Sequence, residues 1–169
     1  MAQVLERSLY QSDYYAWTKQ QAAELRAMAA AGVTSTLDLE HLAEEVESLG
    51  RSDFATARSQ LRRIIEHLLK LEHSPAADPR LGWRESVIEA RDVFADVITA
   101  TLRREIEADL VKTYHQGRRR ADVALRKQGE QEAAKALPAN CPYSLDQLVT
   151  QDWYPANQHG LVDEIAGDL

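Results

Sequence analysis

Residues 54–71 read FATARSQLRRIIEHLLKL, and the fold prediction depends most on this stretch. Its apolar residues recur at alternating steps of three and four, which is the spacing of one face of an α-helix. Ile65 and Leu69 broaden that face. The stretch therefore predicts the clearest helix of the chain, with an apolar stripe made of Phe54, Ala57, Leu61, Ile64, Leu68 and Leu71.

The preceding segment, residues 37–49, is predicted to form a separate helix. It has a narrower apolar stripe at the same kind of spacing, and Gly50 follows it directly. If that stripe continued past Gly50, Asp53 and Thr56 would lie on the apolar face. We therefore expect two helices with a break at Gly50 rather than one long helix. The stripe of the first of them consists of Leu39, Leu42, Val46 and Leu49.

Helical spacing recurs through most of the remaining chain. Seven glycines and five prolines are too few for the many turns of a β-sandwich or barrel. The sequence thus predicts an all-α fold, an antiparallel bundle of about five main helices plus short C-terminal helical segments. We expect a single domain over residues 9–155 and an acidic C-terminal tail over 156–169, either a docking helix or partly disordered. The other main helices are expected near residues 12–31, 82–97 and 102–127, with short ones within 128–136 and 144–149.

The overall charge argues against wholesale attraction to nucleic acid or to an anionic membrane. The formal net charge of the 169 residues is −7, so a polyanion is repelled on average. No apolar run approaches the roughly 20 residues that cross a bilayer. A single cysteine, Cys141, permits no internal disulfide, which suits a reducing compartment. We therefore expect a cytoplasmic protein that does not bind membranes.

Carboxylates and one histidine form the first candidate site. Glu44 and Glu47 lie on one side of the helix expected at 37–49, and His67 lies at the edge of the next apolar stripe. If the two helices pack antiparallel, these groups come together and suit a divalent metal or an acid–base pair. A solvated acidic face is the favoured interpretation, because the chain has neither Glu-x-x-His pairs nor a His-Glu-x-x-His motif. A divalent metal is accordingly the one cofactor considered, and the default expectation is none.

Basic residues form the second candidate site. Residues 101–135 are net positive, with nine basic and six acidic side chains. Lys112, Arg119 and Arg126 are seven residues apart and share a similar helix face, and Arg118 adjoins Arg119. Such a face can contact phosphates or an acidic partner. The competing account is a solvated face, in which Asp122 pairs with Arg118 and Arg126 along the helix.

Five short segments occur in a recognisable order: Tyr10–Trp17, Leu37–Ser52, His67–Lys70, Trp83–Arg84 and Cys141–Leu145. Together they resemble the bacterial family called domain of unknown function twenty-nine, over about residues 9–155. Leu71 departs from the family pattern, because many members have an aromatic residue there, and a packing difference is the implied consequence. The resemblance implies an all-helical fold. It assigns no catalytic residue, since the family has no assigned biochemical function.

These observations favour a non-catalytic helical module that acts through protein contacts in the bacterial cytosol, as a regulatory partner or a homo-oligomer. Separate acidic and basic segments can give such contacts electrostatic specificity. No glycine-rich phosphate loop, nucleophile elbow or dinucleotide motif is present in the sequence, so an enzyme is less favoured. Two alternatives stay open: a small metal-assisted hydrolase using Glu44, Glu47 and His67, and a nucleic-acid contact through the basic helix at 102–127.

Overall fold

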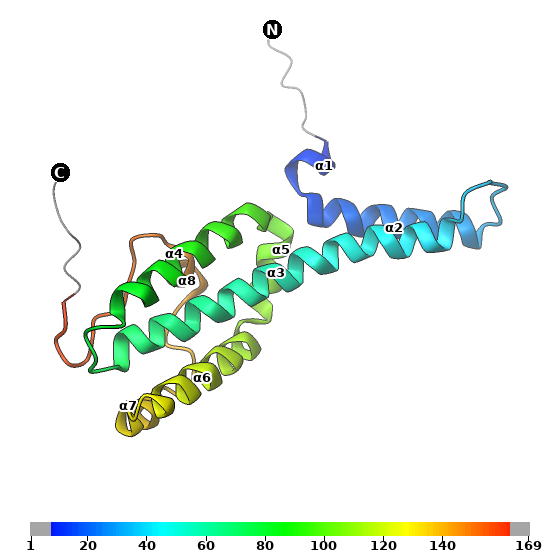
Figure 1. The fold of residues 1–169 in the computed structure, drawn as a ribbon. Helices are drawn as coiled ribbons and strands as arrows, with labels where there is room; N and C mark the ends of the chain where they lie inside the picture. The colour runs from blue at the N-terminus through cyan, green and yellow to red at the C-terminus, as the bar shows by residue number, and fades with distance from the viewer. Residues whose placement is uncertain (1–7, 163–169) are drawn as a thin grey trace, which may run out of the picture. The chain divides into compact units, whose positions relative to one another are not determined.

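The computed structural model describes residues 8–162, and all the regular structure in this range is α-helical (Figure 1). Within the range, five helices have nine residues or more, so the predicted all-α fold of about five main helices with short C-terminal ones is confirmed. The helices are α1 (Leu9–Ser12), α2 (Tyr14–Ala30), α3 (Leu39–His73), α4 (Arg80–Val97), α5 (Ala100–Ala108), α6 (Leu110–Lys127), α7 (Gln131–Ala136) and α8 (Leu145–Val149).

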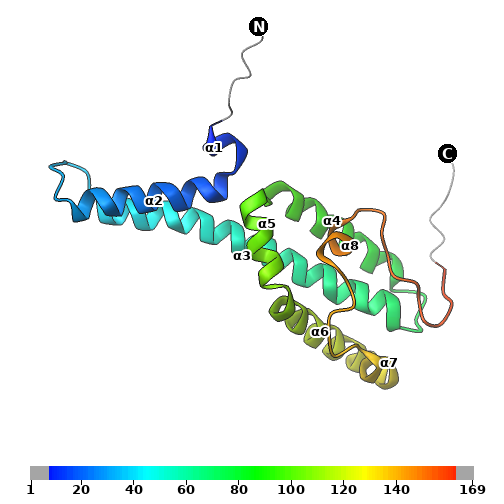
Figure 2. The same cartoon turned by 180° about the vertical axis from the view of Figure 1, so that it is seen from behind.

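The chain divides into two compact units. The first comprises Met1–Ala57 and Val97–Ile106, and the second comprises Arg58–Asp96 and Glu107–Leu169. α3 contributes its N-terminal half to the first unit and its C-terminal half to the second. The single domain expected over residues 9–155 stays a prediction. In the first unit, α2 and the start of α3 form an antiparallel helical hairpin, seen from both sides in Figures 1 and 2.

α3 is one continuous helix, so the predicted break at Gly50 was wrong. A β-carbon at Gly50 would lie only 2.5 Å from Oγ1 of Thr18 on α2. Gly50 therefore marks a close approach of two helices rather than a helix end. Glycine inside a helix costs about 0.5–1 kcal/mol relative to alanine, and the packing that it permits offsets this cost.

Small residues line the side of α3 that faces α2. Ala43 and Gly50 are buried there, and the buried Ala57 continues the same row, at steps of seven, which is the repeat of a helical seam. This seam is in phase with the buried stripe that follows it, so the phase shift inferred at Gly50 does not exist. Leu42 and Leu49 were predicted to be in the stripe, yet they are 38% and 48% exposed. The prediction failed because it counted the large apolar residues and passed over the small ones beside them.

The Asp13 carboxylate links the start of α2 to the start of α5 within the first unit. Its carboxylate accepts a hydrogen bond from the backbone N–H of Ala16 at 3.0 Å, which caps α2. The same carboxylate accepts one from the backbone N–H of Thr101 at 2.8 Å, in the first turn of α5. A second link follows one residue later, where the Tyr15 hydroxyl donates to Glu105 at 2.6 Å. An N-cap of this kind is worth about 1 kcal/mol.

In the second unit, the C-terminal half of α3 is the central helix. α4 and α6 run along it in both views (Figures 1 and 2). A helix that is apolar around much of its circumference belongs inside a core, where each large aliphatic side chain contributes about 1.5–3 kcal/mol. The core residues are at most 2% exposed and include Leu61, Ile64, Ile65, Leu68 and Leu69 of α3, Val87 and Phe94 of α4, and Tyr114 and Leu125 of α6.

A buried arginine on α4 anchors the segment that follows α8. Arg91 is 1% exposed. Its guanidinium donates to four backbone carbonyl oxygens, those of Leu148 (2.8 Å), Gln151 (2.9 Å), Trp153 (2.9 Å) and Gln147 (3.3 Å). Leu148 lies in the last turn of α8, whose carbonyl groups have no partner within the helix. Burial lowers the pKa of Arg91, and the four carbonyl oxygens compensate for the lost solvent.

The end of the described chain satisfies the C-terminal carbonyl groups of α3. The Asn157 side chain donates to the carbonyl oxygens of Leu71 and Ser74, at 2.8 and 2.9 Å. Residues 156–162 contain no helix. The rest of the tail predicted at 156–169, residues 163–169, lies outside the described residues.

Two further sequence predictions concern the second half of the chain. Residues 102–127 were expected to form one helix, but α5 and α6 meet at Asp109, so that prediction was wrong. The Asp109 carboxylate accepts a hydrogen bond from the Thr113 hydroxyl at 3.1 Å, a local interaction that competes with helix continuation. The short helix expected at 144–149 is confirmed, with a capping box formed by Ser144 and Gln147.

The closest approach of α6 to α3 is expected to control the stability of the second unit. At Gly117, an added β-carbon would lie 2.8 Å from Cγ2 of Ile65 and 3.0 Å from the carbonyl oxygen of Arg62. Gly117→Ala should therefore lower the free energy of unfolding by about 1–3 kcal/mol, measured by urea denaturation.

Gly82 on α4 provides a matched control. An added β-carbon at Gly82 meets nothing within 4 Å, so Gly82→Ala should stabilise the protein by about 0.5–1 kcal/mol through helix propensity. Equal effects of the two substitutions would contradict this packing arrangement.

Candidate functional site

The four basic residues singled out in the sequence separate into two groups on α6, two that have partners in the chain and two that line a groove. Arg118 supports the structure, because its guanidinium donates to the carbonyl oxygens of Pro138 and Leu137 at 2.7 and 3.1 Å. Arg126 pairs with Asp122 at 2.9 Å, as the solvated-face account expected. Lys112 and Arg119 are exposed and line a groove in the second unit.

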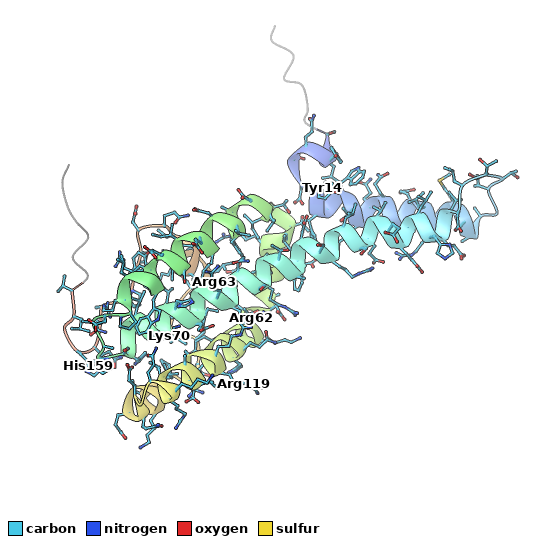
Figure 3. The ribbon with its side chains drawn as sticks, in the orientation of Figure 1. Tyr14, Arg62, Arg63, Lys70, Arg119 and His159 are labelled. Carbon is cyan, nitrogen blue, oxygen red and sulfur yellow. The ribbon has the colours of Figure 1, made fainter. Side chains whose placement is uncertain are left out.

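This groove is lined by one residue of α3, the end of α5 and one side of α6, and it has a volume of about 700 Å³. We call it the basic groove and define it by Arg62, Lys112, His115, Gln116, Arg119 and Arg120. Figure 3 labels Arg62 on α3 and Arg119 on α6, the adjacent helix of the same unit. Ala108 and Val111 add apolar surface, and Asp109 is the carboxylate among the lining residues.

Arg62 is the least exposed cation of the basic groove. One of its terminal nitrogens donates to the Gln116 side chain at 3.3 Å and the other to the Ser59 hydroxyl at 3.4 Å. Its Nε is buried without a hydrogen-bond partner. Burial lowers the pKa of Arg62, and the nearby positive charges of Arg120 and Arg58 lower it further. The guanidinium stays charged, so it carries an incompletely compensated positive charge.

Two carboxylates, Asp109 and Glu66, pair with cations in and near the basic groove. Asp109 lies 3.8 Å from Arg58, and Glu66 lies 3.8 Å from Arg120 and 3.4 Å from Lys70. Lys112 and Arg119 have no ion pair or hydrogen bond with the part of the chain that the structure describes. Lys112 and Arg119 are therefore cations of the basic groove whose positive charge no carboxylate among residues 8–162 neutralises.

Glu44, Glu47 and His67 all lie on α3, whose continuity removes the basis for bringing them together. The metal hypothesis required two antiparallel helices here, and the chain has one. Glu47 pairs instead with Arg26 of α2 at 2.5 Å and with Arg51 at 3.2 Å. Among residues 8–162, no group of three or more His, Cys, Asp or Glu side chains is placed to hold a metal ion.

His67 is held neutral in the second unit. Burial lowers its pKa to about 3, and the positive charges of Lys70 and Arg63 act in the same direction. Its Nδ1 is buried without a hydrogen-bond partner. An imidazole with this pKa is uncharged at neutral pH.

The hairpin of the first unit has a charged edge and an apolar face. Arg26 of α2 and Glu47 of α3 pair across one edge. On the other side of the seam, helical geometry places Met28 of α2 together with Leu42 and Leu49 of α3. Met28 is 41% exposed, similar to the two leucines.

An aromatic cluster continues this face toward the start of α2. Tyr14, labelled in Figure 3, stacks on Trp17 at 5.5 Å between ring centroids, and Tyr10 meets Trp17 edge-on at 4.8 Å. Tyr10 is exposed, whereas Tyr14 and Trp17 are half-buried. We call the surface formed by Tyr10, Tyr14, Trp17, Met28, Leu42 and Leu49 the hairpin face.

Sequence reasoning missed both surfaces in part. It found Lys112 and Arg119 but not Arg62, because Arg62 lies far away along the chain and joins them only through helix packing. It assigned Leu42 and Leu49 to the core. The small residues Ala43 and Gly50 beside them carried the missing signal, since a seam of small residues leaves the adjacent large ones outside.

The structure thus defines an all-α protein with a basic groove in one unit and an exposed apolar face in the other. A family model described as Domain of unknown function DUF29 matches residues 9–154, and the chain belongs to this family. An alpha-helical protein of unknown function from Rhodospirillum rubrum has a similar crystal structure, with a TM-score of 0.73 and 28% identity. The match covers 88% of this chain and 93% of that one. No curated protein matches the chain. Among the described helices, none is long and apolar enough to cross a membrane.

The buried neutral His67 is expected to lower stability in acid. Its pKa is about 3 in the folded protein and about 6.5 when unfolded, so the unfolded chain binds one more proton between these values. The stability that this group contributes at neutral pH is lost as the pH falls from about 6.5 toward 3, by up to about 1.4 kcal/mol per pH unit. His67→Gln should flatten the pH dependence of the free energy of unfolding in that window.

His41→Gln is the matched control. The exposed His41 has a raised pKa because Asp38 accepts a hydrogen bond from it, so its contribution is lost as pH rises rather than as pH falls. Chemical denaturation at a series of pH values checks both variants. An acid slope unchanged by His67→Gln, or flattened equally by His41→Gln, would contradict the burial of His67.

Proposed function

We propose that this chain is a non-catalytic helical interaction module that associates with a second copy of itself through the hairpin face. The exposure of Met28, Leu42 and Leu49 carries the proposal. Large apolar side chains at helical spacing on an outer surface are typical of a contact surface.

A second copy suits the hairpin face better than a charged partner. The cations of the hairpin are paired along the opposite edge, Arg26 with Glu47 and Lys19 with Glu105. The face itself is mostly apolar and aromatic, so it is complementary to its own copy about a two-fold axis. Two hairpins packed in this way form a four-helix bundle, which gives each pair of helices the core that it lacks alone.

The area of the hairpin face is sufficient for a dimer. α2 has 17 residues, which at the helical rise gives a length of about 26 Å. Two helices side by side are about 20 Å wide. The two copies together then bury roughly 1,000 Å², which reaches the lower end of specific protein interfaces.

Polar substitutions on the hairpin face test this proposal. Leu42→Gln combined with Leu49→Gln should weaken the dimer by at least about tenfold, because both leucines are lost from each copy. Sedimentation equilibrium over a range of concentrations measures the dissociation constant. Circular dichroism should report an unchanged helix content, since both positions are exposed.

The matched control carries Ile88→Gln and Val93→Gln on α4. These residues are 45% and 39% exposed and belong to the second unit, so the control makes the same kind of change elsewhere. The control should dimerise like the unaltered protein. An unaltered protein that stays monomeric at high concentration, or a hairpin-face variant that still dimerises normally, would overturn the proposal.

A further inference from the structure

The basic groove stands out electrostatically in an acidic protein. The whole chain has a formal charge of −7, yet the residues that line the groove include four cations and one carboxylate, Asp109. Like charges kept close together raise the free energy of the free protein unless a counter-charge binds. An anion seated among them is favoured for the same reason.

The polar groups of the groove are also arranged to donate hydrogen bonds. The Nε–H of Arg62 is buried with no acceptor, and a buried donor without a partner costs about 1–3 kcal/mol in proteins. Lys112 and Arg119 are exposed on α6 and line the same groove. Guanidinium groups donate in a planar fork that fits the oxygens of phosphate and carboxylate groups.

We propose that the basic groove binds a small ligand with two or more adjacent phosphate groups. Lys112 and Arg119 are seven residues apart, so their backbone positions are separated by about 10 Å along α6. Arg62 of α3 lines the same groove. Three cations spread over this length match a chain of phosphates better than one isolated phosphate. Ala108 and Val111 offer apolar contact to the rest of such a ligand.

The margins of the groove favour a short ligand over a nucleic acid. Asp109 lines the groove and pairs with Arg58, and Glu66 pairs with the lining residue Arg120. An extended polyanion that ran beyond the groove would meet these carboxylates and the net negative charge of the chain. A compact phosphate chain is held within the positive centre.

Binding of inorganic pyrophosphate tests the proposal on the intact chain. Isothermal titration calorimetry at low salt should detect binding that weakens as salt screens the charges. Lys112→Gln combined with Arg119→Gln should weaken the affinity by about tenfold or more, because two charge-assisted contacts are lost. Both residues are exposed, so the variant should keep its helix content.

Lys127→Gln combined with Lys135→Gln is the matched control, because it removes two positive charges outside the groove. Its affinity for pyrophosphate should equal that of the unaltered protein. Absence of binding, or equal losses in the groove and control variants, would overturn the proposal. Tighter binding of a single-stranded oligonucleotide than of pyrophosphate, lost in the groove variant, would overturn it in favour of a nucleic-acid surface.

Discussion

Side-chain size along α3 sets where the other helices can lie. In the first unit, Ala43 and Gly50 let α2 approach closely, and a β-carbon at Gly50 would already collide with Thr18. In the second unit, large aliphatic residues on the same helix separate its neighbours and fill the space between them. Because protein interiors are close-packed, each half of the helix accepts a different kind of partner. The seam of small residues also leaves Leu42 and Leu49 on the outside, which creates the hairpin face.

Polar side chains form hydrogen bonds with the backbone groups at helix ends that apolar packing leaves without partners. Helix ends expose carbonyl groups that no residue of the same helix can satisfy. Arg91 meets this need beyond α8, and Asn157 meets it at the end of α3. Both side chains act on carbonyl groups far away in the sequence. Residues 150–162, which follow α8, are therefore an integral part of the second unit, although they contain no helix.

Local patterns predicted much of the fold. The helical spacing from Phe54 to Leu71 indicated the core helix, and a short helix was expected at 144–149, where the structure has α8. The break at Gly50 was predicted wrongly, because a glycine that allows close packing looks in sequence like one that ends a helix. Asp109 carried no pattern that marked the junction of α5 and α6. Arg62 joins Lys112 and Arg119 only through tertiary packing, so one half of the basic groove had no sequence signal.

The hairpin face and the basic groove give the two units distinct chemistry, apolar in the first and cationic in the second. Self-association through the hairpin face is the central claim, and intermolecular distances test it most directly. A spin label at Ser52→Cys, in a Cys141→Ser background, lies beside the face without occupying it. Paired hairpins about 26 Å long should bring two labels within roughly 40 Å of each other in pulsed dipolar spectroscopy. A signal that contains only the decay of uniformly dispersed monomers would contradict the account.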